Sequence, residues 1–348
     1  MISYRLDRFC QPLVRVARES PEPLGTEVLV QIEACGVCHS DLHLKDGFFD
    51  MGGGKRLDLA QGRALPLTLG HEIAGTVVGL GPEVREVEVG ARRVVYPWIG
   101  CGGCEICTVG QEQLCSHSRA LGVVRDGGFS DYVLVPHSRY LFDFGDLPIT
   151  LACTYACSGL TAYSAVRKVQ SRVDQQQLVI IGLGGVGFAA LRLAQVLTGA
   201  RVIGVDIDDA TLQAAAETGA AVVNAGKEEA VKRLRSLTDG GAPAVLDFVG
   251  GEATATLGFN TLAPGGLLVL VGLFGGEMRA SLPLWPLRSL TVQGSYVGSL
   301  LEMREFMKLA RAERVPQIPV TERPLAHVEA VLDELRSGSV VGRIVLTP

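Results

Sequence analysis

Short runs of alternating hydrophobic and polar residues mark the first half of the chain. Residues 27–33, 73–79 and 131–135 are rich in β-branched residues, with turn-forming residues nearby, which is typical of strands. Long stretches with the 3.6-residue period of a helix are scarce before residue 150. The pattern predicts a β-rich domain, folded as a distorted barrel.

After about residue 150 short apolar runs alternate with amphipathic ones. This alternation predicts a parallel sheet with helices on both faces. The predicted strands are 178–181, 201–206, 221–224, 244–248 and 267–271. The predicted helices are 186–197, 210–218, 228–237, 252–262, 300–312 and 327–337, and the chain ends in a predicted strand at 343–346. The polar, glycine-rich residues 47–66 are predicted to form a surface loop.

Bulk properties exclude several classes of protein. The net charge is −5 without a basic run, which argues against a nucleic-acid surface. The apolar stretch 178–197 has a glycine cluster near its start, which a membrane-spanning helix would not favour. The N-terminus lacks the apolar core of a signal peptide. Together with nine cysteines, an odd number, this predicts a cytoplasmic protein in a reducing compartment with no membrane partner.

Four cysteines lie within fifteen residues, and they are the strongest chemical signal in the chain. Zinc binds four thiolates at tetrahedral corners, and one loop with this spacing can supply them all. Two disulfides are the alternative, but such density belongs to small secreted domains, whereas this chain has 348 residues. We therefore predict a closed, structural zinc site. Its ligands are Cys101, Cys104, Cys107 and Cys115.

A glycine-rich turn links the predicted strand 178–181 to the predicted helix 186–197. Its glycines are Gly182, Gly184, Gly185 and Gly187. In this context the first allows a tight turn, Gly184 lets backbone approach a pyrophosphate, and Gly187 lets helix and strand pack closely. The helix N-terminus supplies free N–H groups for phosphate. The turn predicts a dinucleotide site.

Asp206 ends the next predicted strand, at close to the spacing expected for a ribose-binding carboxylate. It can accept hydrogen bonds from both ribose hydroxyls of NAD and would repel the 2′-phosphate of NADP. No arginine directly follows it. We predict NAD as the cofactor; the alternative is that Asp206 only caps the following turn.

A second metal site is predicted from ligand types that lie far apart in the sequence. A catalytic zinc needs about three protein ligands and one open position. Cys38 and His71 are two candidates, and a third can come from Cys153 or Cys157. Thiolate ligands suit a metal that acts as a Lewis acid on an alcohol.

The chain resembles zinc-dependent medium-chain alcohol dehydrogenases over almost its whole length. The resemblance is carried, in the family's order, by the motifs 36–41 and 70–75, the four-cysteine loop, 157–163 and the glycine turn. It implies a GroES-like catalytic domain at 1–150 and 296–348, with an inserted Rossmann domain at 151–295. It also implies two zinc ions per chain, with Cys157 as the third catalytic ligand.

The resemblance also implies roles for further residues. Ser40 and His43 would relay the substrate proton, Asp41 would orient His71, and Glu72 would lie beside the metal. Thr161 would contact nicotinamide, and His39 and Arg343 would reach the pyrophosphate. Trp98 would form a wall of the substrate pocket. The remaining cysteines, Cys10, Cys35 and Cys153, are then expected to be buried small hydrophobes.

The predicted reaction is hydride transfer between an alcohol and NAD, giving a ketone or aldehyde. Segments 65–71 and 202–208 resemble bacterial secondary-alcohol enzymes, so a medium-sized apolar, secondary alcohol is expected. A polyol or amino-alcohol dehydrogenase of the same family is an alternative, as is a non-catalytic NAD(H)-binding sensor. The cysteine and histidine ligands argue against a zinc-free quinone reductase. A homo-oligomer, dimer or tetramer, is expected.

Overall fold

The computed structural model describes residues 1–60, 64–227, 229–338 and 340–348, and they form two compact units. Unit 1 comprises residues 1–48, 58–160 and 298–348, and unit 2 comprises 49–57 and 161–297. The boundary that we expected at 150/151 lies instead inside helix α4 (Ser158–Val173). No loop marks it, because helical hydrogen bonds run across it. Residues 49–57 also group with unit 2, where the sequence had suggested the catalytic domain.

Unit 1 is built on a seven-stranded sheet whose central strand is β3 (Val28–Gly36). The predicted strands are confirmed as β3, β7 (Glu72–Leu80) and β9 (Tyr132–Val135), with β7 and β9 both antiparallel to β3. The C-terminal strand β18 (Arg343–Thr347) pairs with β3, so both ends of the chain share one sheet. The sheet is completed by β8 (Arg92–Val95), β10 (Leu141–Phe142) and β17 (Val320–Pro324). A second sheet holds β1 (Ile2–Leu6), β2 (Val14–Ala17) and β6 (Leu67–Thr68).

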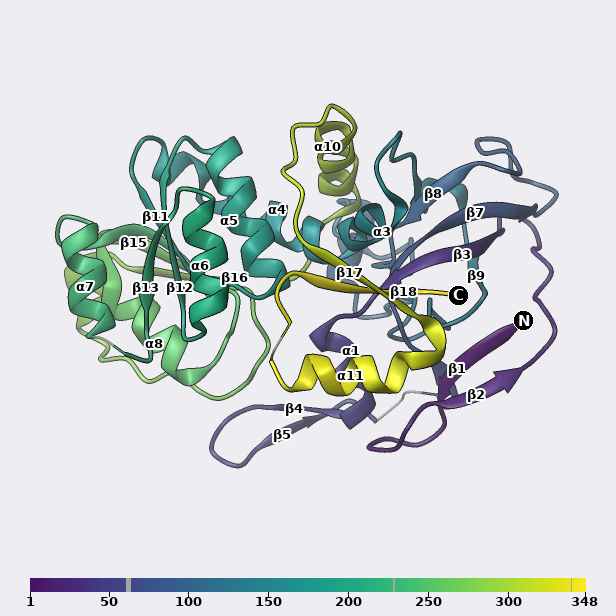
Figure 1. Ribbon diagram of the computed structural model, residues 1–348, viewed down its shortest axis with the longest axis horizontal. Coiled ribbons are helices and arrows are strands. Elements are labelled where there is room, and N and C mark those ends of the chain that lie inside the picture. The colour runs from purple at the N-terminus through teal and green to yellow at the C-terminus, as the bar shows by residue number, and fades with distance from the viewer. Residues whose placement is uncertain (61–63, 228, 339) are drawn as a thin grey trace. The chain divides into compact units, whose positions relative to one another are not determined.

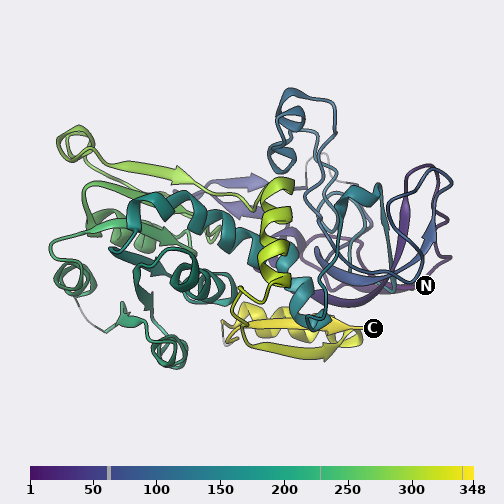
Figure 2. The same cartoon turned by 90° about the horizontal axis from the view of Figure 1, so that it is seen from above.

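The helices of unit 1 are short and lie at strand ends. The predicted helices at 300–312 and 327–337 are confirmed as α10 (Leu300–Arg311) and α11 (Val328–Arg336). α10 begins with a capping box, in which Ser299 and Glu302 exchange hydrogen bonds of 2.8 and 3.2 Å. The others are α1 (His39–Asp46), α2 (Glu105–Thr108), α3 (Ile149–Ala152), and the 3₁₀ turns η1 (Glu112–Leu114), η2 (Ser138–Tyr140), η3 (Cys153–Ala156) and η4 (Leu325–His327). The segment with α2 and η1 projects from the strands (blue in Figure 2).

Two ion pairs join α1 to α11, although the residues are far apart in sequence. Lys45 Nζ lies 2.6 Å from Glu329 Oε2, and the Arg336 guanidinium makes two bonds of 2.8 and 2.9 Å to Asp46. The partners in each pair are separated by 284 and 290 residues. These pairs tie the C-terminal turn of α1 to α11.

Unit 2 contains a six-stranded sheet in the order β13-β12-β11-β14-β15-β16, and every neighbouring pair is parallel (Figure 1). This is the order of a dinucleotide-binding sheet, with its topological switch between β11 and β14. The strands are β11 (Gln177–Ile181), β12 (Arg201–Asp206), β13 (Ala221–Asn224), β14 (Ala242–Asp247), β15 (Leu262–Leu270) and β16 (Thr291–Gly294). The helices are α5 (Gly185–Leu197), α6 (Asp209–Glu217), α7 (Ala230–Leu237), α8 (Glu252–Thr261) and α9 (Leu284–Arg288).

The core of unit 2 explains why its strands lack polar alternation. Leu178 to Ile181 are all at most 2% exposed, because helices cover both faces of a parallel sheet. The alternating strands and helices predicted here are confirmed, apart from the start of the 228–237 helix, because residue 228 lies outside the described residues. Strand β16 and helix α9 were missed, since both are short and largely exposed.

The segment 47–66 is not simply a surface loop. It contains a two-stranded hairpin, β4 (Phe48–Asp50) and β5 (Arg56–Asp58), closed by a glycine turn. Asp50 O accepts a hydrogen bond of 3.3 Å from Gly276 N, in the loop after β15. A Cβ atom placed on Gly52 would lie only 2.7 Å from Glu277 N, so a side chain would collide there. Residues 61–63 of the predicted loop lie outside the described residues.

The described part of the chain has no single helix that is both long and apolar enough to span a membrane. The bent pair Ile149–Ala156 and Ser158–Val173 meets the criteria of length and composition only when the two are taken together.

Candidate active site and metal centres

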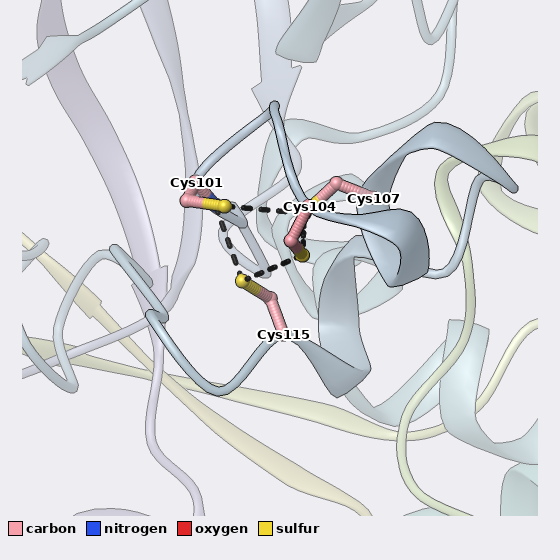
Figure 3. A group of neighbouring side chains, drawn as sticks. All are labelled: Cys101, Cys104, Cys107 and Cys115. Carbon is pink, nitrogen blue, oxygen red and sulfur yellow. Dashed lines mark hydrogen bonds between the residues drawn. The ribbon is translucent and has the colours of Figure 1, made fainter.

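The four predicted cysteine ligands of the closed site converge on one point (Figure 3). Neighbouring sulfurs are 3.5 Å apart for Cys104 and Cys107, 3.8 Å for Cys104 and Cys115, and 3.9 Å for Cys101 and Cys107. A zinc ion with bonds of about 2.3 Å to tetrahedral sulfurs places them roughly 3.8 Å apart. All four cysteines are free thiols, so the disulfide alternative is excluded. The donor set fits zinc.

Backbone groups of this segment prepare the sulfurs for a cation. The N–H groups of Cys101 and His117 each donate to Cys115 Sγ at 3.3 Å. Hydrogen bonds from the backbone at Gly103 and Cys104 lower the pKa of Cys101 to about 6. At Cys101 these contacts favour the thiolate form, which is the form that binds metal, whereas burial raises the pKa of Cys107 to about 12.

The second predicted group brings together three distant segments of unit 1. Cys38 precedes α1, His71 precedes β7, and Cys157 lies between η3 and α4, yet their donor atoms lie within 4.8 Å of one another. All three residues are at most 6% exposed. The His71 Nε2 atom is buried without a hydrogen-bond partner, which is costly unless a ligand occupies it. The group therefore fits a metal ion.

The structure also decides between the two candidates for the third ligand. Cys157 joins Cys38 and His71, whereas the Cys153 thiol donates to Thr150 O at 3.3 Å. Cys153 and Cys35 are buried, as expected. Cys10 is exposed, contrary to expectation, because it lies in the turn after β1 at a positive φ of 59°.

Asp41 lies behind His71 and organises both ligand segments. It is fully buried, and its Oδ2 accepts from Cys38 N at 2.9 Å while its Oδ1 accepts from Gly70 N at 3.2 Å. The same Oδ1 lies 3.3 Å from His71 Nδ1. A carboxylate at Nδ1 leaves Nε2 as the metal-binding nitrogen.

Glu72 and Arg343 form a buried pair next to the three ligands. Arg343 Nη2 lies 2.6 Å from Glu72 Oε1, with side-chain exposures of 4% and 0%. Ser158 N donates to the same oxygen at 3.1 Å. Gly36 is required opposite Glu72, because a Cβ there would lie 2.0 Å from Glu72 Oε2. Both charged residues were predicted site residues, but no motif in the sequence indicated that they pair or that Gly36 makes room for them.

Charges in this centre are strongly coupled. The pKa of Cys38 is held well below its usual value, first by a hydrogen bond from Cys157 and then by His71 and Arg343. Burial opposes the charged form of His71, but Asp41 and Cys38 outweigh it and raise the pKa of His71. Burial also raises the pKa of Glu72, although Arg343 opposes this. The lowered pKa of Cys38 favours its thiolate form, which is the form that binds metal.

The predicted relay residues lie on α1, directly after Cys38. Ser40 Oγ is 3.8 Å from Cys38 Sγ. His43 is half-buried, and burial lowers its pKa. His39, on the same helix, is exposed. Trp98 is 4% exposed; its ring centroid lies 5.2 Å from that of His71, and its Nε1 donates to Ala156 O.

The glycine turn of unit 2 has the geometry that a pyrophosphate requires. Gly182 has a φ of +81°, and a Cβ at Gly187 would lie 1.7 Å from Gly182 O. A Cβ at Gly184 would meet no atom within 4 Å, so the backbone there is open to a ligand. Gly185 begins α5, whose first N–H groups point at this space.

Asp206 contributes to the same turn. Its Oδ2 accepts from Leu183 N at 2.7 Å, and its Oδ1 accepts from Ile207 N and Asp208 N at 2.7 and 3.1 Å. Asp206 therefore does cap the following turn, as the alternative interpretation expected. Its carboxylate is nevertheless partly exposed beside the glycines. Thr161, one turn after Cys157 in α4, has a buried Oγ1 without a hydrogen-bond partner.

Two family models match the chain. Residues 25–146 match the alcohol dehydrogenase GroES-like domain, and residues 185–312 match the zinc-binding dehydrogenase domain. The chain belongs to the zinc-dependent medium-chain alcohol dehydrogenase family.

Several known alcohol dehydrogenases match this chain over its full length. It is 40% identical to an NAD-dependent alcohol dehydrogenase of Sulfurisphaera tokodaii and 37% identical to one of Saccharolobus solfataricus, with 100% of each chain covered. The crystal structure of the Aeropyrum pernix alcohol dehydrogenase is 31% identical, with a TM-score of 0.91 over 100% of both chains. The resemblance inferred from the motifs and the GroES-like plus Rossmann fold are confirmed.

Proposed function

We propose that this protein is an NAD-dependent alcohol dehydrogenase that contains two zinc ions per chain. It transfers a hydride between an alcohol carbon and nicotinamide C4, giving a ketone or aldehyde. The supporting observation is the buried group of Cys38, His71 and Cys157, which offers three protein donors and so fits a catalytic zinc with one position for substrate. A purely structural site would use four protein ligands, as the cysteine loop does.

The residues of α1 handle the substrate proton. Zinc supplies Lewis-acid chemistry, which lowers the pKa of an alcohol hydroxyl. Ser40 accepts the hydroxyl proton at its Oγ, and His43 passes it towards solvent. A histidine suits this step because its pKa lies near operating pH, and burial of His43 favours its neutral, proton-accepting form. Asp41 orients His71, and Glu72 balances the charge of Arg343 beside the ligands.

The cofactor is proposed to bind at the glycine turn of unit 2. The N–H groups at the start of α5 receive the pyrophosphate, and Asp206 accepts from the ribose hydroxyls. The orphaned Thr161 hydroxyl contacts nicotinamide. The expected roles of His39 and Arg343 at the pyrophosphate stay predictions, because desolvation lowers the pKa of His39 and Arg343 is 4% exposed and paired with Glu72. The relatives named NAD-dependent support this choice over NADP.

The substrate is proposed to be a medium-sized apolar alcohol, preferably a secondary one. Trp98 packs beside His71 and forms a wall of the pocket. Apolar pockets discriminate by only about 1–3 kcal/mol per methylene. The enzyme is therefore expected to accept a broad range of alcohols and to use ethanol poorly, mainly through a high KM.

Steady-state turnover with NAD, on a panel of primary, secondary, aromatic and cyclic alcohols and polyols, tests the function. Chelator-stripped protein should lose turnover and regain it with zinc. NAD binding without turnover on any alcohol would favour a non-catalytic sensor. A kcat/KM highest for a polyol or an amino alcohol would favour that alternative, and one highest for ethanol would refute the pocket assignment.

A cytoplasmic location and a homo-oligomer of two or four chains are part of the proposal. All nine cysteines are free thiols, which suits a reducing compartment. Unit 2 exposes large apolar side chains at Phe274, Leu282 and Leu287, with exposures of 73%, 80% and 80%, and a second copy of the chain would cover them. Light scattering coupled to gel filtration tests the oligomer.

A further inference from the structure

Glu112 is a buried acidic residue inside the four-cysteine segment, and it is not one of the sulfur ligands. It begins η1, between the third and fourth cysteines, and is 5% exposed. A buried carboxylate is unfavourable unless charged and hydrogen-bonding partners compensate it. Its partners therefore indicate what holds it there.

Three groups contact the Glu112 carboxylate. Oε2 accepts from Gly100 N at 3.1 Å and from Tyr140 Oη at 2.7 Å, and Oε1 lies 3.1 Å from Arg139 Nη2. The Arg139 guanidinium also lies over the Tyr140 ring, 4.7 Å from its centroid. Both Arg139 and Tyr140 belong to η2, far along the chain from the cysteines.

These contacts connect the two ends of the metal-binding segment. Gly100 directly precedes the first ligand, Cys101, and Cys115 N donates to the Glu112 backbone oxygen at 3.1 Å. The approach is close, because a Cβ at Gly100 would lie 2.5 Å from Cys107 Sγ. The Glu112 carboxylate thus joins the start of the segment to η2, and the Glu112 backbone oxygen holds the end of the segment.

Charge gives Arg139 a second role. A zinc ion with four thiolates carries a net charge of −2, and Glu112 adds another negative charge. Arg139 brings a positive charge to the cysteine segment. It pairs with Glu112, and its Nη2 would lie 3.9 Å from a Cβ atom placed on Gly102, so the guanidinium is close to the segment backbone. Glu112 holds this cation against the cysteine segment.

We propose that Glu112, through Gly100, Arg139 and Tyr140, is a positioning residue that holds the sulfur donors in the geometry of zinc and slows the loss of the structural zinc. The inference concerns the closed site and goes beyond the dehydrogenase reaction. Mutation of a residue that hydrogen-bonds to metal ligands typically lowers the metal affinity by about 10–100-fold.

Zinc release from the purified, zinc-loaded protein tests the proposal. A chromophoric chelator in excess records the release of each zinc at a temperature at which all variants are folded by circular dichroism. Glu112→Gln keeps the size of the side chain and removes its charge. We expect it to release one zinc per chain about 10-fold faster than wild type, with turnover initially retained because the catalytic zinc stays. Glu105→Gln, an exposed residue of the same segment, is the matched control and should release zinc at the wild-type rate.

One further variant and one further measurement separate positioning from general stability. Tyr140→Phe removes the hydrogen bond that the hydroxyl donates to Glu112 and the one it accepts from Arg139, but no charge, so it should accelerate release of the same zinc by a smaller factor, about 3-fold. In Glu112→Gln, Co²⁺ bound at the cysteine site should show a shifted ligand-field spectrum. Release rates for Glu112→Gln and Tyr140→Phe within 2-fold of the control, or equal acceleration of both zinc ions, would overturn the proposal. Wild-type protein with one zinc or fewer would instead refute the metal assignment itself.

Discussion

Replacing Asp41 by asparagine removes the negative charge behind His71 without changing the size of the side chain. The carboxylate faces three nitrogen donors: Cys38 N at 2.9 Å, Gly70 N at 3.2 Å and His71 Nδ1 at 3.3 Å. An asparagine has a single oxygen. If that oxygen faces Gly70 and His71, the amide NH₂ points at the Cys38 N–H, and the reverse orientation is worse because two donors are lost.

The size of the effect follows from these contacts. The better orientation leaves one fully buried N–H unsatisfied, which costs about 1–3 kcal/mol. Because the lost contacts hold the Cys38 and His71 segments, most of this cost falls on metal binding. At about 1.4 kcal/mol per factor of ten, the affinity for the catalytic zinc should fall roughly 10–100-fold, the range typical of such partners.

The assay is a competitive chelator titration of each zinc, with turnover recorded against free zinc concentration. Asp41→Asn should bind the structural zinc normally and regain part of its turnover at high zinc. Asp46→Asn is the matched control: it makes the same change on the same helix, and the Asp46 carboxylate pairs with Arg336 of α11 rather than with the Cys38 or His71 segment. A catalytic-zinc affinity within 2-fold of wild type in Asp41→Asn would refute the positioning role.

Four other substitutions have distinct expected outcomes. Asp206→Asn should lower the kcat/KM preference for NAD over NADP at least about 10-fold, because a negative charge near the 2′-phosphate is removed; a wild-type enzyme that already prefers NADP would contradict this. Ser40→Ala should lose most of its turnover, and His43→Gln should lose less. The His43→Gln deficit should shrink as pH rises, because solvent base then accepts the proton. Since burial lowers the pKa of His43, the acidic limb of the wild-type kcat profile should have its midpoint below the ordinary histidine pKa of about 6.5. Above that midpoint the wild-type rate should be level while the His43→Gln rate still rises with pH, and equal, pH-independent losses would oppose this order. Cys107→Ser should reduce zinc from two ions to one and lower the melting temperature, and unchanged zinc content measured by mass spectrometry would count against the closed site.

Features encoded by neighbouring residues could be predicted well. The four cysteines of the closed site lie in one segment, so their spacing alone specifies a metal loop. The glycine turn between β11 and α5 is likewise local, as is the alternation of strands and helices after residue 160. The hairpin β4–β5 was missed because it lies in a glycine-rich segment typical of a loop. The two compact units divide inside α4, where no break in the sequence marks a boundary.

The sequence by itself determined the family, the cysteine loop and the glycine turn, because each is a pattern of residue types at short spacing. The ligand types alone left Cys153 and Cys157 open and the family resemblance implied Cys157, but only the tertiary structure places Cys157 beside Cys38 and His71. Only the structure showed that Arg343 neutralises Glu72 across strands from opposite ends of the chain, and that Gly36 makes room for that pair. These contacts depend on which strands are neighbours in the sheet. The pairing of β3 with both β7 and β18 brings them together, and no local pattern encodes a pairing across that distance.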